Sequence, residues 1–365
     1  MRWCMWCKGA GSGWGRREFL LAAAGSLLGA RFWLREAEGY SIYDEAGDVK
    51  IGREMDPSIL RQFGYYDGPD LQNYVAQVGQ RVVSSADTRF SFQFKVVDHP
   101  SINAMALPGG FIYVTRGILA EMNDEAQLAG VLGHEITHVN ARHAAKLMTR
   151  ALGTQIATII GIGAAAASGS GAAATGIAMI SSHVTNYMLL GYGRDFEIEA
   201  DEVGLRYARR AGYDPRRTVA FFRALRRHEL LRGQKGYHGF EASHPDTAVR
   251  IAKADTMAQL LLNERGPLEV RADAFKTQLE GLRYGEAKAQ LRLRVYTVQP
   301  GDTLASVARA QMGDEGRRFE IASLNGLRDD EPLRAGSRLK LAVSELLREP
   351  PREPGLDLIL ERQRK

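Results

Sequence analysis

Residues 128–140 read LAGVLGHEITHVN, and this segment constrains the organisation of the whole chain. Residues 124–150 are predicted to form one helix, so His134 and His138, four residues apart, lie on the same face. Two imidazoles at this spacing can bind one metal ion, and Glu135 then lies beside the position left open for water. Apolar neighbours would partly bury such a site. They are Leu128, Val131, Leu132 and Val139.

A second cluster follows further along the chain, where residues 196–204 read FEIEADEVG. A catalytic zinc ion needs three protein ligands and one open position. Glu197 and Asp201 are four residues apart on a predicted helix. Glu197 can therefore supply the third ligand, and Asp201 can hold a ligand histidine through a hydrogen bond. Glu199 and Glu202 are assigned to the solvated face of the same helix. The two clusters together predict one Zn²⁺ ion per chain.

The alternative interpretation of both clusters is structural. His134 and His138 can be solvated or core histidines on an ordinary helix, and the acidic run alone can be an exposed helix face. The metal site is favoured because the second cluster supplies the third ligand that catalytic zinc requires.

Several motifs occur in an order that resembles one known family. The two clusters are accompanied by Asn103-Ala-x-Ala-x-Pro-Gly-Gly-x-Ile-x-Val-Thr-Arg-Gly117, by Arg142-His143 and by Ser243-His244-Pro245. Over residues 40–255 the chain resembles the zinc metallopeptidases that include HtpX, BepA and the CAAX prenyl endopeptidase. The soluble BepA-like branch is the most similar.

This resemblance implies roles for individual residues. His134, His138 and Glu197 would bind zinc, and Glu135 would be the general base. His244 would correspond to a loop histidine that approaches the zinc ion, where it either blocks the ion or stabilises the oxyanion. The structural alternative for His244 is a helix N-terminal residue that precedes a proline.

The same resemblance points to a strand that binds substrate. Gly110, Phe111, Ile112 and Tyr113 lie at or within a predicted strand, residues 111–115, beside the cleft. This strand would pair with an extended substrate, a mode that recognises main chain more than side chains. Broad specificity is therefore expected.

Residues 295–342 are predicted to form a separate small module with a strand, two helices and a returning strand. With Gly301, Asp302, Thr303 and Asn325 at characteristic positions, this βααβ pattern resembles a LysM domain. The resemblance implies binding of glycans that contain N-acetylglucosamine, chiefly peptidoglycan. The alternative is a module that serves only in packing.

The predicted fold class is α+β, with a mainly helical zincin-type metallopeptidase domain that has a small sheet, followed by a small βααβ LysM domain. The predicted boundaries are 1–39 for an export signal and leader, 40–264 for the zinc metallopeptidase domain, 265–294 for a charged connector, 295–342 for the LysM domain and 343–365 for a flexible tail.

The N-terminus has the pattern of an exported protein. Arg16-Arg17-x-Phe19-Leu20 precedes an apolar run of about a dozen residues, which is too short to span a bilayer. This pattern resembles the twin-arginine export signal. An uncleaved anchor and a buried N-terminal helix are the alternatives. Cys4 and Cys7 fall inside the leader, so the remaining chain could form no disulfide. The expected location is the periplasm or cell envelope.

Residues 151–193 contain no Asp, Glu, Lys or Arg. They predict two helices joined by a loop rich in Gly, Ala and Ser, because the middle lacks the large apolar side chains of a membrane helix. Peripheral contact with a bilayer surface is the alternative. The net charge of +5 is modest and no nucleic-acid motif accompanies it, so nucleic acid is not an expected partner. The expected partners are protein or peptide substrates and peptidoglycan.

The combined patterns imply a zinc-dependent endopeptidase that hydrolyses peptide bonds of folded or misfolded cell-envelope proteins while its LysM domain holds peptidoglycan. A role in protein quality control follows by family analogy only. One alternative is a glycan-binding scaffold or chaperone with an idle peptidase site. The other is a hydrolase of peptidoglycan cross-links.

Overall fold

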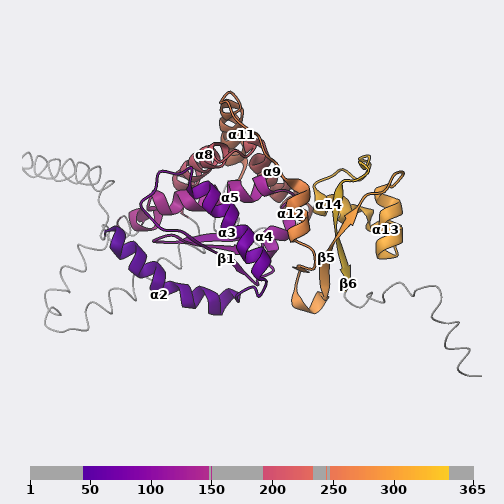
Figure 1. Cartoon of the computed structure of the whole chain (residues 1–365), viewed down its shortest axis with the longest axis horizontal. Helices are drawn as coiled ribbons and strands as arrows, with labels where there is room; N and C mark the ends of the chain where they lie inside the picture. The colour runs from indigo at the N-terminus through magenta and orange to yellow at the C-terminus, as the bar shows by residue number, and fades with distance from the viewer. Residues whose placement is uncertain (1–43, 148, 150–191, 233–243, 245–246, 345–365) are drawn as a thin grey trace, which may run out of the picture.

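A computed structural model describes residues 44–147, 149, 192–232, 244 and 247–344 (Figure 1). The predicted leader, nearly all of the uncharged segment 151–193 and nearly all of the C-terminal tail lie outside the described residues, as do Ser243 and Pro245. None of the helices in the described ranges is both long enough and apolar enough to cross a membrane.

A small sheet lies between α2 (Glu45–Phe63) on one face and α3 (Pro69–Val83) with α5 (Glu125–Asn140) on the other, within the N-terminal domain (residues 44–261). The strands β1 (Gln93–Val97), β2 (Ala104–Leu107) and β3 (Phe111–Thr115) have the order β1-β3-β2. β3 is central, because it pairs in parallel with β1 and antiparallel with β2. Gly109 and Gly110 form the tight β2–β3 turn with φ values of 79° and 102°, a conformation that glycine adopts without strain.

Helices surround this sheet and one another. α2 (Glu45–Phe63) packs on β2 and β3, while α3 (Pro69–Val83) packs on β1. The short α4 (Arg116–Glu121) follows β3 directly, with Thr115 as its N-cap. The other long helices that the structure describes in this domain are α5 (Glu125–Asn140), α8 (Arg194–Arg210), α9 (Pro215–Arg232) and α11 (Thr247–Leu261).

α5 is the central helix of the domain. Asp124 caps its N-terminus, where its Oδ1 accepts a hydrogen bond from the Gln127 amide at 3.0 Å. Every α5 residue except Asn140 is buried, since α3, α8 and α9 all pack against it. A core leucine at such a position contributes about 1.5–3 kcal/mol through burial alone. From Glu125 to Val139 this helix therefore belongs to the core of the domain rather than to an amphipathic surface.

The predicted single helix over 124–150 is interrupted. α5 ends at Asn140, and residues 143–147 are helical again after a turn. Arg142 lies in this turn with a φ of 53°, and its guanidinium pairs with the buried carboxylate of Asp48 in α2. The ion pair holds Arg142 in a conformation that an uninterrupted helix does not allow.

The segment predicted as a connector is part of the core. Residues 265–294 include α12 (Ala272–Gln278), β4 (Arg283–Tyr284) and a 3₁₀ turn at Ala287–Ala289. Its buried apolar side chains belong to the same hydrophobic cluster as the central helix. They are Phe275, Leu279, Leu282 and Leu293. The domains are therefore joined by packed structure, which the charged composition of this segment did not indicate.

The C-terminal module (residues 291–344) has the predicted βααβ order. β5 (Leu291–Thr297) pairs antiparallel with β6 (Arg338–Ser344), and β4 adds a short third strand. α13 (Leu304–Met312) and α14 (Arg318–Asn325) cover this sheet around a small core of their own. β5 starts at Leu291, slightly before the predicted boundary at residue 295. The expected α+β class, with a mainly helical domain followed by a small mixed module, describes this structure.

A pair of phenylalanine variants tests whether the connector is structural. Phe275 is 0% exposed, whereas Phe319 in α14 is 52% exposed. Phe275→Ala is expected to lower the free energy of unfolding by about 3–5 kcal/mol, because it leaves a cavity. Phe319→Ala serves as the control, with an expected change below about 1 kcal/mol. Chemical denaturation of both variants beside the wild type measures the difference. Small and equal changes in the free energy of unfolding of the two variants would contradict the assignment of Phe275 to the core.

Candidate metal centre

Two helices bring three potential ligands together. His134 and His138 project from one face of α5, and their Nε2 atoms are 3.0 Å apart. Glu197, in the first turn of α8, reaches both rings. Its Oε2 lies 3.5 Å from Nε2 of His134, and its Oε1 lies 3.5 Å from Nε2 of His138. The three side chains are almost completely buried.

These donor atoms fit a single zinc ion. Ligand atoms around a tetrahedral zinc ion lie about 2.0–2.2 Å from the metal, and therefore about 3.3 Å from one another. The three separations above fall close to this value. Oε1 of Glu197 has no hydrogen-bond partner among the described residues, which is costly for a buried carboxylate oxygen unless a cation binds it. The geometry and this unsatisfied atom both agree with a metal site.

Two glycines allow α5 and α8 to approach closely enough to form this site. A Cβ atom on Gly133 would lie 2.6 Å from the Gly204 carbonyl oxygen, and one on Gly204 would lie 2.6 Å from the His134 amide nitrogen. Neither position has space for a side chain, because each meets backbone that cannot move aside. The backbones of α5 and α8 are therefore in direct contact beside His134. This contact sets the distance between the histidines and Glu197.

Asp201 fixes the orientation of His134. Its Oδ1 lies 2.9 Å from Nδ1 of His134, so the ring donates its Nδ1 hydrogen and keeps the Nε2 lone pair for a metal. Although burial lowers the pKa of His134, its hydrogen bonds to Asp201 and Glu197 raise the value to about 9. Metal binding below that pH therefore releases a proton from this histidine. The predicted contact between Asp201 and a ligand histidine is present in the structure.

His138 is oriented by a second histidine. Its Nδ1 lies 2.8 Å from Nδ1 of His143, whose Nε2 lies 3.4 Å from a carboxylate oxygen of Glu199. If Glu199 accepts the Nε2 hydrogen, Nδ1 of His143 accepts from His138, and Nε2 of His138 faces the metal position. The Tyr192 ring stacks on His138 with centroids 4.2 Å apart. Burial lowers the pKa of His138 well below its usual value, which favours the neutral form that binds metals.

Arg250 is a member of the site that the sequence analysis missed. Its Nε and Nη2 donate to the two carboxylate oxygens of Asp201, at 2.7 and 2.8 Å. Its Nη1 donates to the His244 carbonyl oxygen at 2.8 Å and lies 3.0 Å from Oε2 of Glu197. Arg250 thus holds Asp201 in place and neutralises the buried carboxylates. The only sequence indication is an arginine on a helix, α11, that begins just after His244.

Glu135 differs from the other buried acids. It is 0% exposed, and neither carboxylate oxygen accepts a hydrogen bond from the described residues. Burial raises the pKa of Glu135, while the nearby positive charges of His244 and His134 oppose this effect. A carboxylate with no structural hydrogen bond, next to the ligand group, is suited to accept a proton during a reaction.

His244 lies inside the ligand group. Its Nδ1 is 2.8 Å from Oε2 of Glu197 and 3.2 Å from Nε2 of His134, and its Nε2 is 3.6 Å from Glu135. One donor atom from each of His134, His138, Glu197 and His244 lies within 4.8 Å of the others. The structure therefore places His244 within the group of potential metal ligands rather than at a remote helix end.

Burial raises the pKa of Glu197, but the positive charges and hydrogen bonds of His244 and His134 outweigh it and hold the value well below its usual range. Asp201 behaves in the same way, with Arg250 as the main opposing charge. Glu197 is thus ionised and ready to bind a cation.

Comparison with known proteins agrees with this geometry. The sequence profile described as peptidase family M48 matches residues 69–258, and the LysM domain profile matches residues 296–342. The chain belongs to peptidase family M48. The predicted family and fold class are confirmed, and the match supports the predicted enzyme class, a metalloendopeptidase, with one zinc ion as cofactor.

Curated relatives in this family carry related names. The chain is 29% identical over 237 residues to the beta-barrel assembly-enhancing protease of Escherichia coli K12, covering 61% of this chain and 47% of the relative. It is 32% identical over 189 residues to the mitochondrial metalloendopeptidase OMA1 of Schizosaccharomyces pombe, covering 50% of this chain and 51% of the relative. The chain spans from 33% to 51% of the length of these curated relatives.

The predicted substrate strand needs a correction. Residues 111–113 belong to β3, whose two edges are already paired with β1 and β2, and Gly110 belongs to the turn that precedes it. An added strand needs a free edge. Within the described residues, the strand of this M48 domain with an unpaired edge beside α5 is β2, whose Ala106 and Leu107 line a small pocket of about 10 Å³ together with His138. The sequence located the strand at residues 111–115 but could not reveal which strands pair with it.

The predicted glycan-binding residues shape the loops of the LysM module. Asp302 accepts hydrogen bonds from the Tyr296 hydroxyl and the Gln299 amide, and Thr303 caps α13. Gly301 provides the turn with a φ of 86°. Asn325 is buried, and its amide is bonded to the main chain of Lys340 and of its own helix. The side chains of Asp302, Thr303 and Asn325 thus make hydrogen bonds within the module.

The close contact between α5 and α8 can be tested directly. Gly204→Ala is expected to weaken zinc binding at least about tenfold, because the helices must separate and Glu197 then moves away from the histidines. Gly316→Ala in the C-terminal module is the matched control, since its Cβ would meet only a side chain, that of Asp314. Competitive titration against a zinc chelator measures the affinity. Wild-type affinity in Gly204→Ala would contradict the assigned contact.

Proposed function

We propose that this chain is a zinc-dependent endopeptidase in which His134, His138 and Glu197 bind the metal and Glu135 is the general base. The observation that carries the proposal is the Glu135 carboxylate. It is completely buried beside the three convergent ligand atoms, yet no described residue donates a hydrogen bond to it. A purely structural carboxylate at this depth would be paired.

Each site residue has a separate role in the proposed hydrolysis of a peptide bond. A zinc ion bound by this group would supply Lewis-acid polarisation of the scissile carbonyl and activation of water. Glu135 accepts a proton from the attacking water and passes it to the leaving amine. Asp201 and His143 hold the rings of His134 and His138 in the orientation that presents Nε2. His244 must withdraw from Glu197 or share the fourth position before a substrate carbonyl enters.

The β2 edge is the proposed substrate-binding strand. An extended peptide that adds to β2 would lie along α5, close to His138. Recognition by main-chain hydrogen bonds tolerates many side chains, so the expected substrates are extended or unfolded segments. The Tyr192 hydroxyl donates to the Ala106 carbonyl of β2 at 3.3 Å, and this contact would be displaced or shared when a peptide binds.

The proposed cellular role is hydrolysis of folded or misfolded cell-envelope proteins in the periplasm, with the LysM module held on peptidoglycan. The LysM match supports the glycan partner, and the relative whose name refers to beta-barrel assembly supports an envelope substrate. Export through the leader is part of the same proposal. We keep residue 264 as the end of the peptidase domain and residue 295 as the start of the LysM domain in this proposal. The residues between them are packed structure that joins the two domains.

Substitution of the general base provides the primary test. Glu135→Gln is expected to lower kcat for cleavage of unfolded casein by about 100- to 10,000-fold, because the amide cannot accept the proton. Zinc content should equal that of the wild type, since Glu135 is not assigned as a ligand. Metal analysis and a casein cleavage assay on the same preparations measure both quantities.

The control is His138→Ala, which is expected to lose both zinc and activity. Equal zinc content in His138→Ala and wild type would contradict the ligand assignment. Unchanged proteolysis in Glu135→Gln would instead contradict the role of Glu135. A wild-type protein that binds peptidoglycan but cleaves no protein would favour the scaffold alternative.

Substrate class is tested by parallel incubation of the zinc-loaded protein with casein and with purified peptidoglycan. We expect cleavage of casein, sedimentation of the protein with peptidoglycan, and no release of cross-linked peptides. Mass spectrometry of the soluble fraction measures any release. Release of cross-link fragments that depends on Glu135 would show the cell-wall hydrolase alternative to be correct.

A further inference from the structure

Lys340 is a buried lysine that joins the LysM module to the peptidase domain. It lies on β6, and its side chain is 0% exposed. Its Nζ donates to the carbonyl oxygens of Ala120 and Met122, at 2.5 and 2.6 Å. These partners are more than two hundred residues earlier in the chain, at the C-terminal end of α4. Lys340 therefore binds the peptidase domain rather than its own module.

The two carbonyls are ones that a helix leaves without internal partners. α4 ends at Glu121 with Met122 as its C-cap. The last carbonyls of a helix need external donors, and a positive charge is favourable at this end. Asn123 Nδ2 donates to the intervening Glu121 carbonyl at 3.3 Å. Lys340 thus completes the cap of α4 from outside the domain.

The capped segment connects the sheet to the metal-binding helix. α4 begins immediately after β3, and α5 begins at Glu125, with Asp124 as its N-cap. β3 pairs with β2, the proposed substrate strand. The position of α4 and its C-terminal turn therefore relates the substrate strand to the helix that carries His134 and Glu135.

The N-terminal end of α4 is also bound to the C-terminal part of the chain. Arg116, its first residue, donates to the carbonyl oxygens of Arg283 and Gly285 at 3.0 and 2.9 Å. Both acceptors belong to the segment around β4, which is a strand of the LysM sheet. α4 is thus bound at both ends by the C-terminal part of the chain.

Lys340 is itself fixed within the module. Asn325 in α14 accepts from the Lys340 amide and donates to the Lys340 carbonyl, both at 2.8 Å. Lys276 in α12 donates to the Arg338 carbonyl at 2.8 Å. These bonds hold the backbone of β6 in place. The bonds from the Lys340 side chain to α4 therefore fix α4 relative to the module.

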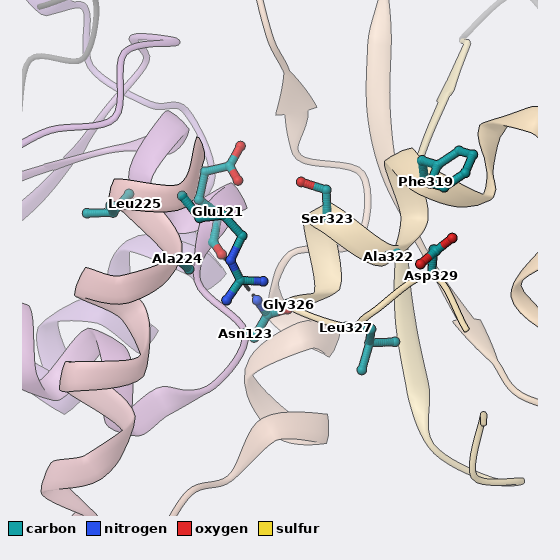
Figure 2. A pocket seen from close by; sticks show the side chains of 11 residues that line it. Glu121, Asn123, Ala224, Leu225, Phe319, Ala322, Ser323, Gly326, Leu327 and Asp329 are labelled. Carbon is teal, nitrogen blue, oxygen red and sulfur yellow. Dashed lines mark hydrogen bonds between the residues drawn. The ribbon is translucent and has the colours of Figure 1, made fainter. Parts of the chain in front are cut away.

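A cavity borders this junction next to the residues that Lys340 binds. A cavity of about 260 Å³ separates α9 from the face of α14 that carries Phe319, Ala322 and Ser323. Figure 2 shows Glu121, Asn123, Ala224 and Leu225 on one side of this space and Ser323, Ala322 and Phe319 on the other. Because the packing between α9 and α14 is incomplete, the hydrogen bonds of Lys340 and Arg116 contribute to docking of the module.

Burial of the charged Lys340 side chain costs free energy, because the ammonium group loses its contact with water. Burial lowers the pKa of Lys340 to about 7, and Lys276 acts in the same direction, while Glu121 and Asp124 oppose them. A simple apolar side chain would fill the same volume without this penalty. An apolar residue would, however, leave the Ala120 and Met122 carbonyls buried without donors.

We propose that Lys340 is a positioning residue for the peptidase reaction, and that the LysM module is an integral part of the catalytic unit. This inference rests on the proposed endopeptidase function. Lys340 holds the α4–α5 connection, and through it the distance between the β2 edge and the catalytic group on α5. Loss of Lys340 would leave substrate binding along β2 intact but misalign the bound peptide with Glu135.

The test compares Lys340→Met with wild type, using full-length zinc-loaded protein and a quenched fluorescent peptide derived from casein. We expect kcat to fall about 10- to 100-fold while KM changes less than about threefold, because small misplacements of bound substrate reduce the rate strongly. Assays are run well below the unfolding midpoint of each variant. Arg309→Met on α13 is the matched control, since it removes an exposed positive charge from the same module away from the junction.

A wild-type kcat in folded, zinc-loaded Lys340→Met would overturn the proposal and leave Lys340 a structural role only. If Lys340→Met does not fold, Lys340→Gln replaces it, since its shorter neutral amide reaches at most one carbonyl. A reduced kcat at unchanged KM supports the proposal, and wild-type kinetics overturn it.

Hydrogen exchange separates this inference from the proposed function. Amides at residues 122–128 are expected to exchange faster in Lys340→Met, but not in Arg309→Met. Unchanged exchange would overturn the inference even in an active enzyme. A wild-type protein without proteolysis would refute the proposed function, whereas faster exchange in Lys340→Met would still show that Lys340 holds the metal-binding helix.

Discussion

The backbone contact between α5 and α8 is the constraint on which the site depends. Gly133 and Gly204 leave no space for side chains between the two helices, so Glu197 is delivered to the histidines at ligand distance. A larger residue at either glycine would move a carboxylate that has to meet two imidazoles within a fraction of an ångström. The geometry of the metal centre therefore depends on how closely α5 and α8 pack.

Close packing also buries three acidic side chains near one another, Glu135, Glu197 and Asp201. Buried carboxylates are unfavourable unless they are paired with positive charge. Arg250 provides this charge for two of these acids by direct contact with Glu197 and Asp201. Glu135 lacks such a partner and is the acid assigned to chemistry. Acids held by fixed hydrogen bonds orient the site, and the acid without one remains available to exchange a proton.

The sequence predicted those features that depend on local spacing. His134, His138, Glu197 and Asp201 were predicted because each pair is four residues apart on a helix, and the structure brings these residues together. Arg250 could not be predicted, because its partner Asp201 is distant in the chain and no periodic pattern links them. The free edge of β2 was missed because residues 104–107 were not predicted as a strand, and because a local pattern does not reveal which strands pair. In the connector, the spacing of Phe275, Leu279 and Leu282 was available as evidence of a buried face, but the surrounding charges concealed it.

The burial of that connector changes how the LysM module should be understood. A module attached by a flexible linker would only raise the local concentration of enzyme near its glycan. Here Leu324 and Ala342 of the module belong to the same hydrophobic cluster as α5. Lys340 donates to the C-terminal end of α4, and Arg116 at the N-terminal end of α4 donates to the β4 segment. Under the proposed function, a glycan bound to the module would therefore hold the cleft at a fixed distance and orientation. Substrates would then be selected by whether an unfolded segment can reach the β2 edge from that position, in addition to the sequence that is cleaved.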